Sequence, residues 1–315
     1  MTDSNPPKAL VIAGLLTIQV LFGINYVVTK IVVGAFPPLV WASIRIILCS
    51  IIMFAISAAF RRDRFPKDGR RFFVPMIVFS LLGSVINQGS FLVGLRHTTA
   101  TNSAILNTLI PVFTLLIVTL RGQERLTPRR LIGFVLAFGG VLVIRKVEDL
   151  TLSAETALGD GLTILNCLSY ALFLSYAKKF LETHDRVWTT TWLFAYGSVG
   201  LTLLALPDYA NFTPPEITPA LLASMTFAIL GGTLATYFLN VWTLTYANSS
   251  SVSIFVYLQP IVASALAYFW FGELISVRTF AASLMIFGGV LLALRSPGAV
   301  PARAPVPTPT PIDPS

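Results

Sequence analysis

The stretch that decides the fold is residues 95–145, LRHTTATNSAILNTLIPVFTLLIVTLRGQERLTPRRLIGFVLAFGGVLVIR, because a second copy of it occurs at residues 244–295. Each copy is an apolar segment with a proline at its middle, a short turn with Gly and Glu, and a second apolar segment. Internal repeats determine how a chain folds, so the sequence indicates a duplicated protein. At an offset of 149 residues, Pro111 corresponds to Pro260, Glu124 to Glu273, Thr127 to Ser276, Arg129 to Arg278, and GGVL at 139–142 to GGVL at 288–291.

The composition indicates a membrane protein. Hydrophobic residues make up 55% of the chain and charged residues 11%, with a mean hydropathy of +0.78, which is far from the range of soluble domains. The net charge of +8 would suggest an acidic partner in a soluble protein. Here the basic residues lie between apolar segments, so we attribute them to membrane topology. Cys49 and Cys167 fall in apolar runs, and His97 and His184 lack metal-ligand spacing, so we expect no metal site.

Ten segments are long and apolar enough to span a bilayer as helices, which takes about 20 residues. They are residues 9–33, 37–60, 72–94, 99–120, 129–145, 159–180, 187–206, 219–243, 249–271 and 278–295. The predicted divisions are an N-terminus at 1–8, a first repeat at 9–147, a linker at 148–158, a second repeat at 159–296, and a disordered Pro-rich tail at 297–315.

The Lys and Arg residues predict the orientation, because loops rich in them stay in the cytoplasm. With the N-terminus inside, sixteen of the 22 basic residues fall on the cytoplasmic side, five fall outside, and Arg45 lies within a span. Both termini are therefore predicted to be cytoplasmic. Five spans in each half is an odd number, so the second repeat must insert upside down relative to the first. Inverted repeats with a binding site at their interface are typical of secondary transporters.

Short motifs occur in the same order in both halves of the chain. They are Phe22-Gly23-Ile24-Asn25-Tyr26 followed by Lys30, Pro38 and Arg45, the prolines Pro111 and Pro260, the turns at 122–127 and 272–276, and the glycine pairs Gly139-Gly140 and Gly288-Gly289. These motifs resemble the EamA repeat of the drug/metabolite transporter superfamily. The resemblance implies an all-α, ten-helix membrane fold, with two inverted five-helix repeats around a central cavity. It also implies an inner-membrane carrier, and many such carriers export amino acids or other small metabolites.

Polar side chains within the spans are the candidate site residues, because such groups are costly in a membrane and usually face a cavity or another helix. We expect the substrate site in the outer half and middle of the membrane. For any single Asn or Gln, a hydrogen bond to a neighbouring helix is an equally good explanation. The predicted substrate-binding residues are Asn25, Tyr26, Thr29, Arg45, Asn87, Gln88, Asn107, Asn166, Tyr170, Tyr237, Tyr257 and Gln259.

Arg45 differs from the amides, because a buried cation needs a partner or water. A cavity-facing role is favoured over snorkelling toward the outer headgroups. At an offset of 148 the second half has Leu193 in the corresponding position, so any role of Arg45 is asymmetric.

The prolines and glutamates of the repeat carry structural predictions. Pro111 and Pro260 each remove a helical hydrogen bond, and we predict kinks there that serve as hinges. Glu124 and Glu273 are predicted to anchor their turns, because Thr127-Pro128 and Ser276 have the pattern of helix N-caps. The small residues near 133–140 and 281–289 are predicted to make close helix contacts.

The acidic residues all lie in loops or at span ends, so no span carries the buried carboxylate that proton-coupled carriers often use. The sequence therefore favours facilitated diffusion or exchange. We predict an alternating-access carrier that exports small metabolites, amino acids first, across the inner membrane. Multidrug or lipophilic-cation efflux and exchange of phosphorylated or nucleotide-linked metabolites remain alternatives. A membrane-embedded enzyme is least favoured, because the spans hold no paired nucleophile and base.

The expected partners are the small-molecule substrate and the lipid bilayer. We expect no nucleic acid and no cofactor, and a monomer is the expected state. The predicted location is the inner (plasma) membrane, with multiple passes.

Overall fold

The computed structural model describes residues 6–67, 69–98, 106–144, 155–259, 261–262, 265 and 277–295. Within these ranges the chain is helical and forms no strand, as the sequence predicts. The helices of the first half are α1 (Lys8–Ala35), α2 (Pro38–Phe60), η1 (Arg62–Arg64), α3 (Arg70–Ser80), η2 (Leu81–Ile86), α4 (Asn87–His97), α6 (Leu109–Leu120) and α7 (Pro128–Ile144). Those of the second half are α8 (Ala157–Leu181), α9 (Arg186–Tyr209), α10 (Pro219–Ile229), η4 (Leu230–Ala235), α11 (Thr236–Tyr246), α12 (Ser249–Ile254), η5 (Phe255–Leu258) and α14 (Val277–Leu294).

Six helical segments in the described ranges are long and apolar enough to cross a membrane, so the protein is a multi-pass membrane protein. They are Lys8–Asn25, Pro38–Phe60, Arg70–Gly94, Ala157–Leu181, Arg186–Tyr209 and Pro219–Tyr246, and they coincide with the predicted spans 9–33, 37–60, 72–94, 159–180, 187–206 and 219–243. The other four predicted spans contain the shorter helices α6, α7, α12 with η5, and α14, and parts of three of those spans lie outside the described residues.

Local sequence signals explain where several helices begin. The Asp185 carboxylate accepts hydrogen bonds from the backbone N–H groups of Val187 and Trp188 at the start of α9, at 3.0 and 3.1 Å. Thr218 caps α10 in the same way. At the start of α7 the Thr127 hydroxyl accepts from the Arg130 backbone N–H at 3.3 Å. This last contact confirms the predicted N-cap, since a hydroxyl there satisfies an otherwise unpaired N–H group.

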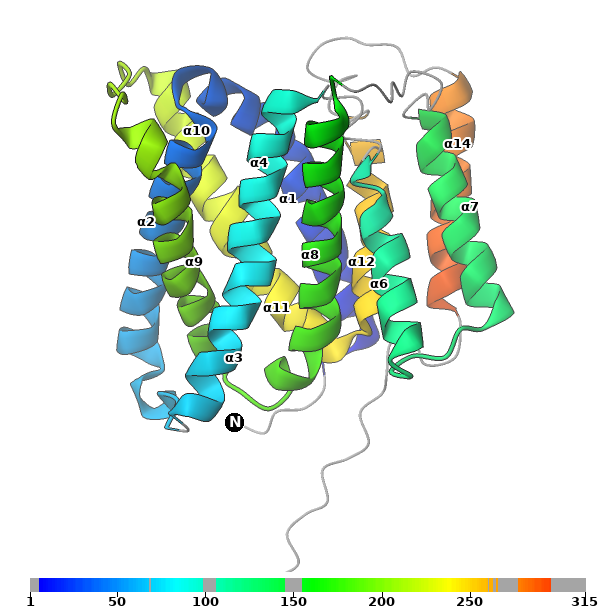
Figure 1. Ribbon diagram of the computed structural model, residues 1–315. Coiled ribbons are helices and arrows are strands. Elements are labelled where there is room, and N and C mark those ends of the chain that lie inside the picture. The colour runs from blue at the N-terminus through cyan, green and yellow to red at the C-terminus, as the bar shows by residue number, and fades with distance from the viewer. Residues whose placement is uncertain are drawn as a thin grey trace, which may run out of the picture.

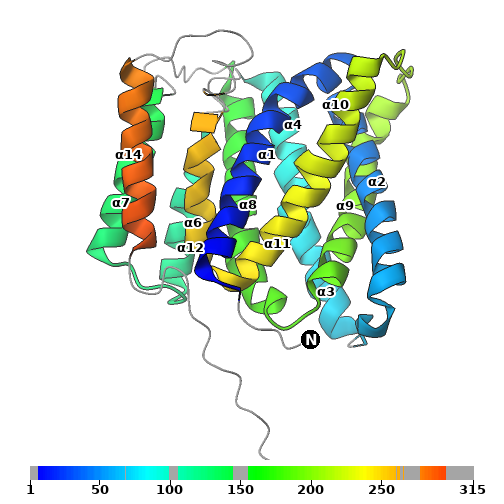
Figure 2. The same ribbon diagram turned by 180° about the vertical axis from the view of Figure 1, so that it is seen from behind.

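The long helices lie side by side and cross one common slab (Figure 1). The start of α1 and the end of α14 lie at the same face of this slab, which we call the termini face (Figures 1 and 2). The turn between α6 and α7 and the junction between α11 and α12 lie at this face as well. Large apolar side chains such as Ile51, Leu131 and Leu203 are exposed on the outer surfaces of the helices, where lipid would cover them.

The helices pack in four main groups: α7 with α14, α2 with α9, α8 with α4 and α6, and α1 with α10 and α11. The α7–α14 contact depends on small residues. A Cβ on Gly289 would lie 2.5 Å from the Ala137 backbone N, and one on Gly133 would lie 2.7 Å from the Gly289 carbonyl O. The two backbones therefore touch, which confirms the predicted small-residue contacts.

Two spans contain a π-helical segment that the sequence analysis did not predict. The segments η2 and η4 begin at Leu81 and Leu230, so they lie at the 149-residue offset of the repeat. A π-helical turn leaves backbone carbonyls without their usual partners. Side chains of other helices fill this role: Ser169 donates to the Leu82 carbonyl at 2.6 Å and Tyr237 to the Gly83 carbonyl at 3.1 Å.

The proline-containing segments are interrupted rather than smoothly kinked. Asn107 and Thr108 form a turn, and α6 begins only at Leu109, so the buried Pro111 lies in its first turn. Because Pro111 has no N–H group to give to the Asn107 carbonyl, Ile110 donates to that oxygen instead, at 3.2 Å. Pro260 lies outside the described residues, and the segment just before it, Phe255–Leu258, narrows to a 3₁₀ helix.

Candidate substrate-binding site

Arg45 begins a chain of hydrogen bonds that joins three spans near the two π-helical segments. One guanidinium nitrogen (Nη2) of Arg45 on α2 donates to Gln88 Oε1 on α4 at 2.7 Å. The other end of that amide donates to Tyr237 Oη on α11 at 2.6 Å. Tyr237 then donates to the Gly83 carbonyl of η2. Gln88 and Tyr237 each follow a π-helical segment, and they lie 149 residues apart, so equivalent positions of the two repeats meet here.

A second chain connects three asparagines beside the first. The Asn87 side-chain amide on α4 donates to Asn166 Oδ1 on α8 at 2.5 Å. Asn166 in turn donates to Asn107 Oδ1 at 2.7 Å, in the turn that precedes α6. The interruption before Pro111 thus places the Asn107 side chain against α8. Asn87 and Gln88 are neighbours in sequence, so α4 contributes to both chains.

The third contact pairs α8 with α11. Asn240 donates to the Tyr170 hydroxyl, and Tyr170 lies one helical turn after Asn166 on α8. Asn240 is not among the substrate-binding residues predicted from the sequence, although its position three residues after Tyr237 places both on one helix face. We name these eight residues the central polar cluster: Arg45, Asn87, Gln88, Asn107, Asn166, Tyr170, Tyr237 and Asn240.

Several buried polar atoms in and near the cluster have no hydrogen-bond partner within the described part of the chain. They include Arg45 Nε, Asn240 Oδ1, Asn25 Oδ1 and Thr29 Oγ1. Buried polar groups in folded proteins are nearly always paired, so these atoms are the ones a bound ligand could satisfy. Asn25 lies close to the second π-helical segment, because a Cβ on Gly232 would be 2.2 Å from its Oδ1.

Arg45 has no acidic partner among the residues that the structure describes. None of the ion pairs in these ranges includes Arg45, and within them its guanidinium donates to a neutral amide. A cation in this position attracts an anionic group, since charge-assisted hydrogen bonds are the stronger ones. An anionic group such as a carboxylate is therefore the kind of ligand group that would suit Arg45.

Not all predicted site residues join the cluster. Gln259 donates to Gln19 of α1 at 3.0 Å, which is a contact between helices. The Tyr257 side chain is buried, its ring lies 6.2 Å from that of Phe138, and its hydroxyl has no partner in the described part. The side chain of Tyr26, the residue Pro260 and the residue Glu273 lie outside the described residues.

Other features of the described residues are not site candidates. No group of three His, Cys, Asp or Glu residues could hold a metal ion there, and Cys49 and Cys167 are free and buried. An apolar groove of about 640 Å³ lies along α10 and the start of η4, but it lacks the amides and cation of the central polar cluster. It is lined by Pro219, Leu222, Ala223, Thr226, Phe227, Leu230 and Gly231.

Sequence comparison identifies the family of the chain that contains this cluster. The EamA-like transporter family matches residues 9–146 and again residues 157–295. The chain belongs to the EamA-like transporter family. The protein is therefore a membrane transporter and not an enzyme, and the central polar cluster is a candidate site for transported substrate.

Relatives in three kinds of organism have similar sequences along most of the chain. An uncharacterized transporter of Archaeoglobus fulgidus is 28% identical, over 85% of this chain and 91% of the relative. The uncharacterized transporter YyaM of Bacillus subtilis is 25% identical, over 89% of this chain and 92% of the relative. A WAT1-related protein of Arabidopsis thaliana is 23% identical, over 88% and 82%. One crystal structure matches 91% of this chain and 98% of its own with a TM-score of 0.76 at 14% identity, which indicates a common fold.

Proposed function

We propose that this EamA-family transporter is an alternating-access carrier with ten membrane-spanning helices in two inverted repeats, at 9–147 and 159–296. The helix contacts support this arrangement. Helices at equivalent positions of the two halves contact each other in the pairs α2–α9 and α7–α14. In the same way, α4 of the first half corresponds to α11 of the second, and α8 corresponds to α1. The contact between α4 and α8 therefore has its counterpart in the contact between α11 and α1. The two π-helical segments at the repeat offset fit the same two-fold relation. A substrate site between inverted repeats is a common transporter design.

The proposed substrates are small metabolites with a carboxylate, amino acids first. The observation that carries this proposal is Arg45, a cation of α2 held by Gln88 of α4 at 2.7 Å without an acidic partner in the described ranges. The free acceptors Asn25 Oδ1 and Asn240 Oδ1 would suit an ammonium group. Tyr170, stacked on Phe173 at 6.0 Å, and Tyr237 would face the variable part of the substrate.

The proposed location is the inner membrane, with the termini face in the cytoplasm and transport directed outward. The distribution of basic residues supports this orientation, because positive loops stay inside. The turns at the termini face hold Arg61, Arg62, Arg64, Lys67, Arg70, Arg71, Arg121, Arg125 and Arg129.

The proposed mechanism is facilitated diffusion or exchange by a monomer. The central polar cluster contains amides, phenols and one arginine, and no carboxylate that could relay a proton. Phosphorylated substrates would need more cations than Arg45 supplies. Arg45 would repel a lipophilic cation, but the aromatic rings of the cluster could bind one. The transport experiment must therefore include a lipophilic cation.

Counterflow in proteoliposomes tests this proposal. Vesicles preloaded with unlabelled amino acids should take up the labelled amino acid in excess of empty vesicles, without any ion gradient. Preloading with a lipophilic cation should give no such uptake. Exchange of the cation together with no exchange of amino acids would replace the substrate proposal by drug efflux. A strict requirement for a proton gradient would refute the facilitated mechanism.

A further inference from the structure

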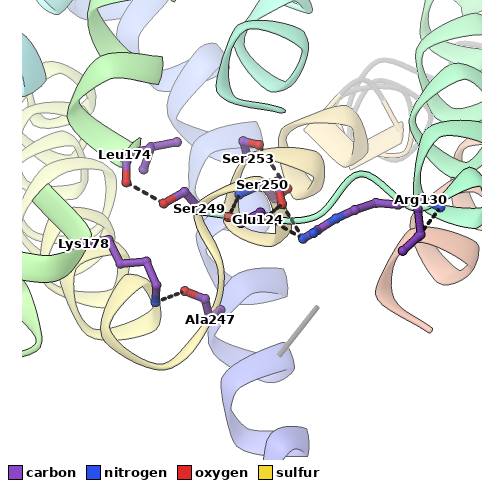
Figure 3. A network of polar contacts seen from close by, with 9 residues as sticks. Glu124, Arg130, Leu174, Lys178, Ala247, Ser249, Ser250 and Ser253 are labelled. Carbon is purple, nitrogen blue, oxygen red and sulfur yellow. Dashed lines mark hydrogen bonds and ion pairs between the residues drawn. The ribbon is translucent and has the colours of Figure 1, made fainter. Parts of the chain in front are cut away.

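A buried ion pair of the first half, at the termini face, is hydrogen-bonded to a serine of the second half. Arg130 of α7 lies 2.7 Å from the Glu124 carboxylate in the turn between α6 and α7, and their side chains are only 3% and 6% exposed. Ser250, in the first turn of α12, is the third member. Its hydroxyl donates to Glu124 and accepts from Arg130, and its backbone N–H donates to Glu124 Oε1 at 3.3 Å. We call these three residues the clasp (Figure 3).

The clasp holds α12, which packs beside α8 on the termini-face side of the central polar cluster. Every residue of α12 is buried, and α12 contacts α6, α8, α11 and α14. The Ser249 hydroxyl donates to the Leu174 carbonyl of α8 at 2.7 Å. Leu174 lies one helical turn beyond Tyr170 of the cluster, so the start of α12 is held one turn from the cluster.

The next turn of α8 carries Lys178, which contacts the end of α11. Lys178 donates to the Ala247 carbonyl at 2.7 Å and to the Leu244 carbonyl at 3.2 Å, at the end of α11 (Figure 3). It thereby ties the junction between α11 and α12 to α8. These bonds cross between parts of the chain that must separate if the cluster is to open toward the termini face.

The residue types of the clasp are not repeated at the equivalent positions of the other half. At the offset of 149, Glu124 corresponds to Glu273, but Arg130 corresponds to Thr279 and Ser250 to Thr101. The two halves therefore differ in sequence at the positions of the clasp.

We propose that the clasp is the gate of the termini face, and that it makes the state closed at this face the resting state of the carrier. This inference rests on the proposed alternating-access function. Removing one partner of a buried ion pair leaves the other charge buried without compensation. Loss of Glu124 or Arg130 would thus destabilise the closed end and shift the population toward the state open at the termini face.

The experiment uses a reporter cysteine that the closed state protects. Ser253 is fully buried one turn along α12 and donates to the Ser250 carbonyl at 3.0 Å. Ser253→Cys is made in a chain in which Cys49 and Cys167 are replaced by alanine. A membrane-impermeant maleimide is added to membrane vesicles of either orientation, and Lys67→Cys, at an exposed loop position, reports which orientation presents the termini face.

Arg130→Gln and Ser250→Ala should each raise the labelling rate of the reporter by about tenfold or more from the termini face, because minor states are typically populated at about 0.1–10%. The matched control is Arg129→Gln, which removes the same charge from the adjacent, exposed position and should leave the rate unchanged. Ser250→Ala keeps both charges paired, so it carries the test if Arg130→Gln does not fold.

Unchanged labelling in Ser250→Ala and in folded Arg130→Gln would overturn the proposal, as would an equal increase in Arg129→Gln. Labelling needs no substrate. A failed gate therefore shows in the maleimide rates, whereas a failed substrate proposal shows only in counterflow of the wild-type protein.

Discussion

Gly232→Ala tests whether the second π-helical segment positions Asn25 beside the central polar cluster. An added Cβ would lie 2.2 Å from Asn25 Oδ1 and 2.5 Å from its Cγ. The Asn25 side chain must therefore retreat by about 1 Å or more to reach ordinary contact distance. Overpacking of this kind costs about 1–3 kcal/mol, and a displacement of about 1 Å at a binding site can reduce turnover about 100-fold.

Gly231→Ala is the matched control, because it makes the same change one residue earlier in the same segment. The three atoms nearest to its Cβ would all belong to the ring of Phe227, four residues earlier in the same span, and the nearest would lie at 3.1 Å. Both variants gain the same backbone preference for alanine over glycine. The difference between them in thermal unfolding of the purified protein and in counterflow therefore isolates the contact with Asn25.

The double variant Gly232→Ala/Asn25→Ala separates stability from transport. Removing the Asn25 amide relieves the clash, so the unfolding midpoint should return toward that of the wild type, while counterflow should stay low if Asn25 serves the substrate. Equal stability and equal counterflow in Gly232→Ala and Gly231→Ala would refute the reasoning, since η4 would then not press on α1.

Two further substitutions have expected effects on stability. Gly289→Ala should lower the midpoint of thermal unfolding, because its Cβ would lie 2.5 Å from the Ala137 backbone N. Gly288→Ala should not lower it, because the atom nearest to its Cβ would be 3.8 Å away. Equal midpoints in the two variants would contradict the close α7–α14 contact. Tyr237→Phe should cost about 1–3 kcal/mol, because the Gln88 Nε2 group and the Gly83 carbonyl each lose their bond to the Tyr237 hydroxyl. Tyr257→Phe should be nearly neutral, since its hydroxyl has no partner in the described part, and a larger loss in Tyr257→Phe than in Tyr237→Phe would contradict the assigned contacts.

The course of the helices could be predicted from the sequence because it depends on composition and local signals. The long apolar runs, the Pro37-Pro38 start of α2 and the Thr127 cap each act within a few residues of the chain. The π-helical segments were missed, because Gly83 and Gly232 read as ordinary small residues within apolar runs. Their matching positions in the two repeats were the signal that could have found them.

The contacts of the site depended on tertiary packing that residue types do not specify. Asn166 and Gln259 are both amides within predicted spans, and the sequence does not distinguish them. In the structure Asn166 joins the central polar cluster, whereas Gln259 pairs with Gln19. Glu124 was predicted to anchor its own turn. Its carboxylate pairs with Arg130 at the start of the next helix and also accepts a hydrogen bond from Ser250, 126 residues away. Local capping logic cannot predict a partner at that distance.

The most direct test of the account concerns the ligand of Arg45. Inhibition of amino-acid counterflow is measured with the amino acid and with the corresponding amine that lacks the carboxylate, in the wild type and in Arg45→Gln. A hydrogen bond to a charged group contributes about 1.5–3 kcal/mol, so the wild type should prefer the amino acid by about 10–100-fold, and Arg45→Gln should lose that preference. The same preference in both proteins would contradict the claim that Arg45 binds the substrate carboxylate.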